Sequence, residues 1–133
     1  MGFAEDIKAF ADKTEEKMNL AVRNIALELF SRVILKTPVD TGRARANWQV
    51  AIGSVPAGTL ELEDKPGTAT ISAADAAASG LRAGDVIYLA NNLPYIQRLE
   101  DGYSGQAPAG MVGLTVQEFQ GIADQIGLEL SLI

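Results

Sequence analysis

The chain has 133 residues, of which 47% are hydrophobic, and this predicts a single domain, residues 1–133, with one core. It contains no cysteine and no histidine, which excludes disulfides, thiolate or imidazole metal sites, cysteine nucleophiles and Ser-His-Asp triads. The net charge is −6, and residues 67–133 carry two Lys/Arg against seven Asp/Glu, which argues against nucleic-acid binding because phosphates are bound by cations.

Residues 3–36 are predicted to form a single long helix, because their apolar residues recur at steps of three and four and no Gly or Pro interrupts them. Pro38 ends the pattern, since it biases the preceding residue away from helical geometry. The helix would be about 50 Å long, whereas a domain of this size is roughly 28 Å across. Part of it must project, kink or pack on another subunit, unless it is a core helix with a slight bend. The apolar stripe comprises Phe3, Ile7, Phe10, Met18, Val22, Ile25, Leu29 and Val33.

The segment after this helix is predicted to turn and to enter a small antiparallel sheet. Residues 37–43 combine Pro, Asp and Gly as turns do, and residues 46–52 then alternate as a strand does. Residues 53–69 are rich in Gly, Pro and acids, which predicts a flexible loop, with a short edge strand possible at residues 60–62. The best strand is predicted at residues 85–90.

Short helices are predicted to connect these strands, and a longer helix to follow them. Ser72–Asp75 resembles a capping box that opens a short helix, which Gly80 closes. Residues 93–101 are predicted to form another short helix, with Pro94 in its first turn. The last helix is predicted at residues 112–130, from the spacing of Val112, Thr115, Phe119, Ile122, Ile126 and Leu130.

This last helix would begin later if Thr115–Glu118 acted as a capping box. The order of the elements predicts an α+β fold, in which a long N-terminal helix and a C-terminal helix pack on a small, mainly antiparallel sheet with short connecting helices.

No group of residues predicts catalysis. The acids at residues 61–64 and at residues 100–101 have no histidine beside them, and residues 102–113 are rich in Gly but lack the Lys-Ser/Thr of a phosphate-binding loop. We therefore expect no enzyme, no catalytic residues, no metal and no cofactor. The N-terminus is acidic, and the uncharged stretch at residues 102–117 is too short and polar to cross a bilayer, so we expect no membrane association either.

Two blocks of the sequence are denser in Pro, Gly, Asn and aromatic residues than a simple core requires: block 1, residues 37–48, and block 2, residues 91–108. Turn chemistry and core aromatics account for most of them. Trp48 is predicted to be buried between the strand and the first helix. Glu100 is predicted to pair with Arg43 or Arg45, and so to tie the two blocks together. The candidate structural or interface residues are Pro38, Asp40, Thr41, Gly42, Arg43, Trp48, Asn92, Pro94, Tyr95, Leu99, Glu100, Gly102, Tyr103, Gln106 and Pro108.

These blocks resemble the motifs of a family of small proteins of tailed bacteriophages and prophages, the tail-component, neck or tail-completion (head–tail joining) proteins. In that family a Ser/Thr-Pro-Val-Asp-Thr-Gly-Arg motif follows the first helix, as at residues 37–43 here. A second motif, Asn-x-x-Pro-Tyr-x-x-x-Leu/Val-Glu-x-Gly followed by Gln-x-Pro, is similar to residues 91–108. The chain departs from the family at Asp101, where an uncharged residue is frequent, and residues 53–85 match no motif.

The resemblance implies a structural virion protein that assembles, as a ring, at the head-proximal end of the tail. Its partners would be further copies of itself and other tail or connector proteins, without specific binding to nucleic acid. It would be assembled in the cytoplasm of the bacterial host. The alternative is a small, non-enzymatic binding or regulatory module that acts through the loop of Tyr103 and Gln106.

Overall fold

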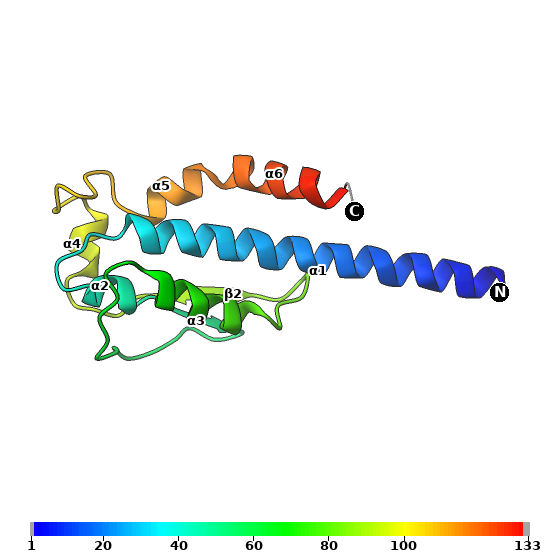
Figure 1. Ribbon diagram of the computed structural model, residues 1–133, viewed down its shortest axis with the longest axis horizontal. Helices are drawn as coiled ribbons and strands as arrows, with labels where there is room; N and C mark the ends of the chain where they lie inside the picture. Colours follow the sequence, from blue (N-terminus) through cyan, green and yellow to red (C-terminus); the bar gives the residue numbers. More distant parts are fainter. Residues whose placement is uncertain (1, 132–133) are drawn as a thin grey trace.

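One long helix, α1 (Phe3–Lys36), organises the molecule, and it has the bounds that the sequence predicts (Figure 1). The computed structural model describes residues 2–131, and it describes the side chains of these except Phe10 and residues 129–131, so Phe10 and Leu130 of the predicted stripes lie outside the described side chains. The α+β class is confirmed, with a small antiparallel sheet and helices at both ends of the chain.

Two layers of structure lie on opposite sides of α1 (Figure 1). On one side are α3 (Thr68–Ala78) and the sheet of β1 (Gln49–Ile52) and β2 (Ile87–Ala90). The C-terminal helices, α5 (Val112–Gln117) and α6 (Phe119–Ser131), lie on the other side, so they pack on α1 rather than on the sheet itself. Two short helices, α2 (Arg43–Ala46) and α4 (Ile96–Glu100), lie at the end of the molecule where α1 ends.

The two strands pair antiparallel, with Gln49 opposite Ala90 and Ile52 opposite Ile87. Both are shorter than predicted. The first is shortened because residues 43–46 form a helical turn, in which the Ala46 N–H donates to the Gly42 carbonyl. The second is shortened because the Asp85 N–H is used in a turn with the carbonyl of Arg82.

The helix α3 begins at Thr68, four residues before the predicted capping box, because its cap lies further back in the chain. The carboxylate of Asp64 accepts hydrogen bonds from the Gly67 N–H at 3.2 Å, from the Thr70 N–H at 2.8 Å and from the Thr70 hydroxyl at 2.7 Å. Partial burial raises the pKa of Asp64, but the bonds from Thr70 and Gly67 outweigh it and hold this pKa below its ordinary value.

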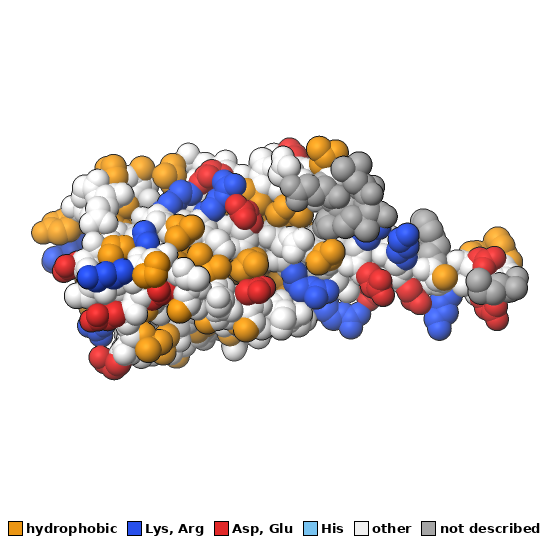
Figure 2. All heavy atoms as spheres, viewed as in Figure 1, with side chains coloured by type: hydrophobic (Ala, Val, Ile, Leu, Met, Phe, Trp, Pro, Cys, Tyr) orange, Lys and Arg blue, Asp and Glu red, His pale blue; other side chains and the backbone are white. Residues whose placement is uncertain are grey.

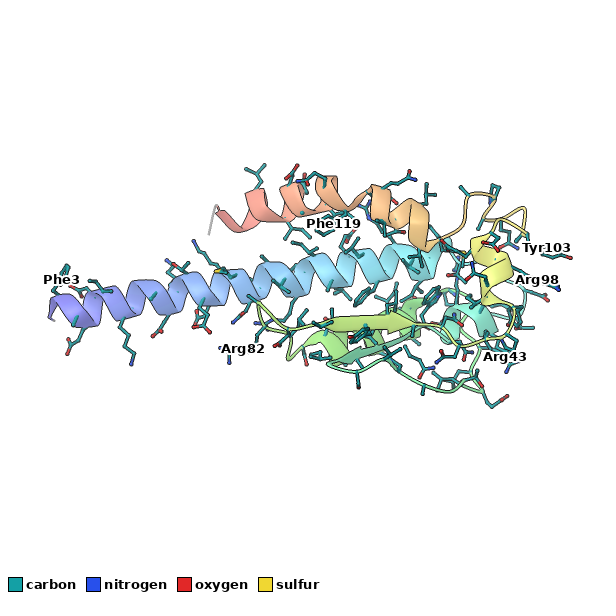
Figure 3. The ribbon with its side chains drawn as sticks, turned by 180° about the vertical axis from the view of Figure 1, so that it is seen from behind. Phe3, Arg43, Arg82, Arg98, Tyr103 and Phe119 are labelled. Atoms are coloured by element: carbon teal, nitrogen blue, oxygen red, sulfur yellow. The ribbon has the colours of Figure 1, made fainter. Side chains whose placement is uncertain are left out.

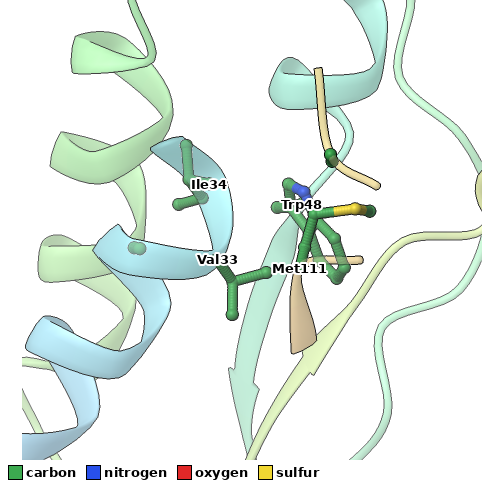
Figure 4. Packing of buried hydrophobic residues seen from close by; sticks show 6 residues of the cluster. Val33, Ile34, Trp48 and Met111 are labelled. Carbon is green, nitrogen blue, oxygen red and sulfur yellow. The ribbon is translucent and has the colours of Figure 1, made fainter. Parts of the chain in front are cut away.

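The core contains Trp48, which is buried against α1 as predicted (Figure 4). It packs in one cluster with residues from both layers, and its ring N–H donates to the Thr37 hydroxyl at 2.8 Å. That hydroxyl in turn donates to the Val33 carbonyl at 2.8 Å, so the ring N–H of Trp48 and the hydroxyl of Thr37 both have partners in the core. The cluster comprises Val33, Ile34, Trp48, Ala74, Ala107 and Met111.

The predicted C-terminal helix is divided in two at Glu118. The carboxylate of Glu118 accepts a hydrogen bond from Arg32 at 2.6 Å and another from Lys36, which lowers the pKa of Glu118. Thr115 does not open a later helix, since its hydroxyl donates to the Met111 carbonyl within α5. Beyond this break Ile122 and Ile126 of α6 form a second, smaller apolar cluster on α1.

Residues 53–67 form a loop, as predicted, but the possible edge strand at residues 60–62 does not form. The backbone of Leu60 instead pairs with the side chain of Asn47: its N–H donates to Oδ1 at 2.7 Å, and its carbonyl accepts from Nδ2 at 3.1 Å. Near the end of the loop, the Asp64 N–H donates to the Gly42 carbonyl at 3.0 Å.

These bonds sharpen the prediction that the loop is flexible. We expect the amide hydrogens of Leu60 and Asp64 to exchange with solvent slowly and those of residues 61–63 rapidly, because only the first two have partners in the fold. Hydrogen exchange followed by NMR measures this residue by residue. In an Asn47→Ala variant Leu60 should exchange as fast as its neighbours, and slow exchange over residues 61–63 of the parent chain would contradict the prediction.

Candidate functional site

The two sequence blocks meet at the end of the molecule that lies opposite the N-terminus (Figure 1). The contact is a reciprocal pair of hydrogen bonds between the backbone of Val39 and the side chain of Gln106. The Val39 N–H donates to Oε1 at 2.8 Å, and the Val39 carbonyl accepts from Nε2 at 3.0 Å. The Gln106 amide thus pairs with block 1 as a strand backbone would. A second link is made by Asn91, whose Nδ2 donates to the Ala44 carbonyl at 2.9 Å.

Between the two blocks lies an open cavity of about 340 Å³. Block 1 forms one wall with its turn and the first residues of α2, and block 2 forms the other with α4 and the loop after it. Nine of the fifteen candidate residues line this cavity, which are Pro38, Asp40, Thr41, Gly42, Arg43, Tyr95, Leu99, Tyr103 and Gln106. Residues that the sequence places more than 50 positions apart are therefore brought to one surface.

The outer wall of the cavity is aromatic. The ring of Tyr103 is 78% exposed, and the Arg98 guanidinium lies 5.9 Å from its centroid, within reach of a cation–π interaction (Figure 3). Tyr95 is 38% exposed beside it. Exposed tyrosines next to arginines are typical of surfaces that bind protein, because they supply contact area and hydrogen bonds at little cost in side-chain entropy.

The predicted pairing of Glu100 with Arg43 or Arg45 is wrong. Arg43 lies 3.8 Å from the exposed carboxylate of Glu61, and its Nε is buried without a hydrogen-bond partner. Arg45 donates to three carbonyls, those of Leu35 and Thr37 at the end of α1 and that of Lys65 in the loop. Arg45 thus caps the C-terminal end of α1, where carbonyls lack helical partners.

Glu100 instead binds the backbone that leads into α5. Its carboxylate accepts from the N–H groups of Met111 at 2.9 Å, Val112 at 3.0 Å and Gly113 at 2.9 Å. Partial burial raises the pKa of Glu100, but these three donors outweigh it and hold this pKa below its ordinary value. Glu100 therefore does not tie the two blocks together; it holds block 2 to the segment that follows it.

This arrangement predicts a dependence of stability on pH. The folded-state pKa of Glu100 is depressed, so its ionised carboxylate contributes to the free energy of unfolding. This contribution is complete above the unfolded-state pKa of about 4.3 and is lost as the pH falls through the folded-state pKa. We expect the free energy of unfolding of the Glu100→Gln variant to lie below that of the parent chain at pH 6 and to converge with it toward pH 3. Asp64 and Glu118 titrate in both proteins and so cancel. Denaturant melts along this pH range measure the difference, and curves that stay parallel would contradict it.

The remaining candidate residues support the cavity from outside. Asn92 donates from Nδ2 to the carbonyls of Pro56 and Gly58, so it holds the long loop. Gly102 has φ +88° and lies against the backbone of Pro108, where an added Cβ would be 2.3 Å from the Pro108 oxygen. Pro94 is exposed before α4. Trp48 lies in the core beneath the blocks rather than in the cavity.

Sequence reasoning missed the residues that build this end of the molecule through backbone contacts. Arg45 and Asn47 bind carbonyl or N–H groups of other segments, and Asp64 binds N–H groups at the start of the helix that follows it. Asn91 begins block 2, but its neighbour Asn92 stands among the candidate residues in its place. The sequence carries no local signal for these contacts, because the backbone groups that they bind become available only in the folded chain.

Among the side chains that the structure describes, no group of three or more acidic residues gathers as a metal site would require, and no helix of the described residues is both long and apolar enough to cross a membrane. Comparisons of the chain with protein-family models, with curated proteins and with solved structures found no match.

Proposed function

We propose that this protein is a structural subunit of a tailed-bacteriophage virion, a tail-completion or neck protein that assembles as a ring at the head-proximal end of the tail. The observation that carries the proposal is the convergence of the two blocks. The motifs on which the phage resemblance rests line one cavity and are joined there by Val39 and Gln106. If the two motifs bind the same partner, they must lie on one surface, and here they do.

The projecting part of α1 also supports a role in assembly. Phe3 is 80% exposed and Ile7 is 51% exposed, on the N-terminal part of α1 that extends beyond the body (Figure 3). An exposed apolar stripe of this kind is typical of a surface that is covered in an assembly. The acidic C-terminal half fits such a ring as well, since a passage for DNA must not hold phosphates.

The test is the mass of the purified protein as a function of concentration. Light scattering coupled to size-exclusion chromatography should show growth from the 14.1 kDa subunit to a closed oligomer, and negative-stain electron microscopy should show rings. In a phage or prophage that carries this gene, a nonsense mutation in it should yield heads and tails that do not join. A normal yield of infectious virions from that mutant would overturn the proposal.

A second candidate function is a binding module that acts as a monomer through the loop of Tyr103 and Gln106. The aromatic wall of the cavity favours it, because Tyr95 and Tyr103 are exposed at the mouth without a role in the core. The same mass measurement separates the two functions. A monomer at every concentration, together with a protein that is captured by the parent chain and not by a Tyr103→Ala variant, would favour the module.

A further inference from the structure

The molecule exposes more surface than a compact protein of its mass. Its accessible surface is 8066 Å², whereas a globular monomer of 14.1 kDa exposes roughly 6,700 Å². The excess of about 1,300 Å² is within the total area that a standard protein–protein interface buries. The shape of the chain therefore suits a subunit that covers this surface by association.

The excess comes from the N-terminal part of α1. Every described side chain from Gly2 to Glu16 is exposed, and the first ion pair of this helix with the body is that of Glu15 with Arg82 (Figure 3). Phe3 and Ile7 lie one turn apart and so form one apolar face, which we call the tip; they are 80% and 51% exposed. Figure 2 shows the hydrophobic surface at the end of this projection, away from the body.

The body carries an apolar groove of about 390 Å³ along the second half of α1. Its floor is formed by α1, and its walls by the start of α6 and by the turn and strand around β2. Phe119 stands at its edge and is 44% exposed. Asp85 is the single charged residue of its lining, and the full lining is Val22, Ile25, Ala26, Leu29, Phe30, Leu81, Asp85, Ile87 and Phe119.

The tip of a subunit cannot fill the groove of the same subunit. Both lie on one unbroken helix, and from Ile7 to Ile25 this helix rises about 27 Å. A tip that fills the groove must therefore come from another copy of the chain. A second copy brings an apolar face of two large side chains on a rigid helix, and covering that face removes part of the excess surface noted above.

We infer that the Phe3/Ile7 tip of one subunit docks in the groove beside Phe119 of the next subunit. This inference rests on the proposed self-assembly and specifies its contact. Because the tip and the groove are different surfaces of one chain, the contact is heterologous, and repeated copies close into a ring or continue as a helix. A symmetric dimer of two tips would leave the groove empty and would end assembly at two subunits.

The absence of cysteine from the sequence allows a direct test by disulfide cross-linking. One preparation carries Ile7→Cys and the other Phe119→Cys, and the two are mixed under mild oxidation. We expect cross-linked dimers between the two variants at least tenfold faster than in a control mixture of Ile7→Cys with Leu62→Cys, because Leu62 is an exposed apolar residue of the distant loop. The chain with both Ile7→Cys and Phe119→Cys should give a ladder of covalent oligomers.

A second measurement does not depend on cysteine chemistry. The double variant Phe3→Asp/Ile7→Asp should raise the dissociation constant of self-association at least about 100-fold, because burying each large apolar side chain contributes more than a factor of ten. Both changes lie on an exposed part of the helix, so the thermal melt should be nearly unchanged. Val55→Asp, at another exposed apolar residue, is the matched control and should leave the constant unchanged.

The outcomes separate this inference from the proposed function. Cross-linking of Ile7→Cys with itself as fast as with Phe119→Cys would overturn the heterologous contact in favour of a symmetric one. Equal rates with Leu62→Cys, or unchanged association of the aspartate variant, would overturn the inference while rings of the parent chain still supported the function. Specific cross-links in a protein that is dispensable for virions would support the contact and overturn the phage role.

Discussion

Replacement of Trp48 by alanine is expected to lower the free energy of unfolding by about 3–5 kcal/mol. Trp48 is 8% exposed and packs in one cluster with residues of α1, α3 and the segment before α5, so its removal leaves a cavity where these elements meet. It also leaves the hydroxyl of Thr37 without the donor that it now accepts from. Denaturant melts followed by circular dichroism measure the change.

Two variants separate the causes of this loss. Trp48→Phe retains most of the apolar contact and removes the ring N–H, so it should cost about 1–3 kcal/mol, less than the alanine variant. Tyr103→Ala removes an aromatic ring that is 78% exposed and should change stability by less than about 0.5 kcal/mol. A loss below about 1 kcal/mol for Trp48→Ala would show that the buried cluster does not depend on this ring.

Replacement of Gly110 by alanine is expected to cost about 3 kcal/mol or more. Gly110 has φ +82°, which an L-residue rarely adopts, and an added Cβ would lie 2.3 Å from the carbonyl oxygen of Glu100 and 3.1 Å from its carboxylate. The methyl group would therefore push apart the two segments that Glu100 joins, and the three bonds to the start of α5 would weaken together.

The matched control is Gly84→Ala. Gly84 has φ +94°, but an added Cβ there would meet nothing within 4 Å, so this variant incurs only the backbone strain of about 1–2 kcal/mol. The difference between the two variants isolates the steric contact at Gly110. If both lost the same stability in urea melts, the close approach of Glu100 to Gly110 would be disproved.

The parts of the fold that sequence could predict are those that depend on local pattern. The bounds of α1 follow from apolar periodicity and from Pro38, and the burial of Trp48 follows from its size and its place beside a strand. The sequence does not predict the start of α3, because the residue that caps it, Asp64, stands in the loop before the helix and not at the N-cap position. The N-cap is Gly67, at φ +82°, and its N–H donates to the Asp64 carboxylate. A remote cap of this kind leaves no periodic signal.

The candidate site was predicted as a set of residues but not as a set of contacts. Block 1 and block 2 do meet, yet the bonds that join them run from amide side chains to backbone groups, as for Gln106 with Val39. Charge matching predicts that Glu100 pairs with Arg43 or Arg45, because side-chain charges are visible in a sequence and free N–H groups are not. The three donors of Glu100 become available only where the chain turns into α5.

The two apolar clusters on α1 have a consequence for cooperativity. The cluster of Ile122 and Ile126 is small and rests on Ala21, Ile25 and Leu29, whereas the larger cluster around Trp48 lies further along the same helix. A helix that is shared by a small and a large cluster can lose the small one first. Detachment of α6 would then be a local opening that precedes global unfolding, and it would extend the uncovered apolar stripe of α1 from the tip toward the middle of the molecule. The apolar area that α1 offers to a neighbouring subunit would then depend on the fraction of molecules in which α6 is detached.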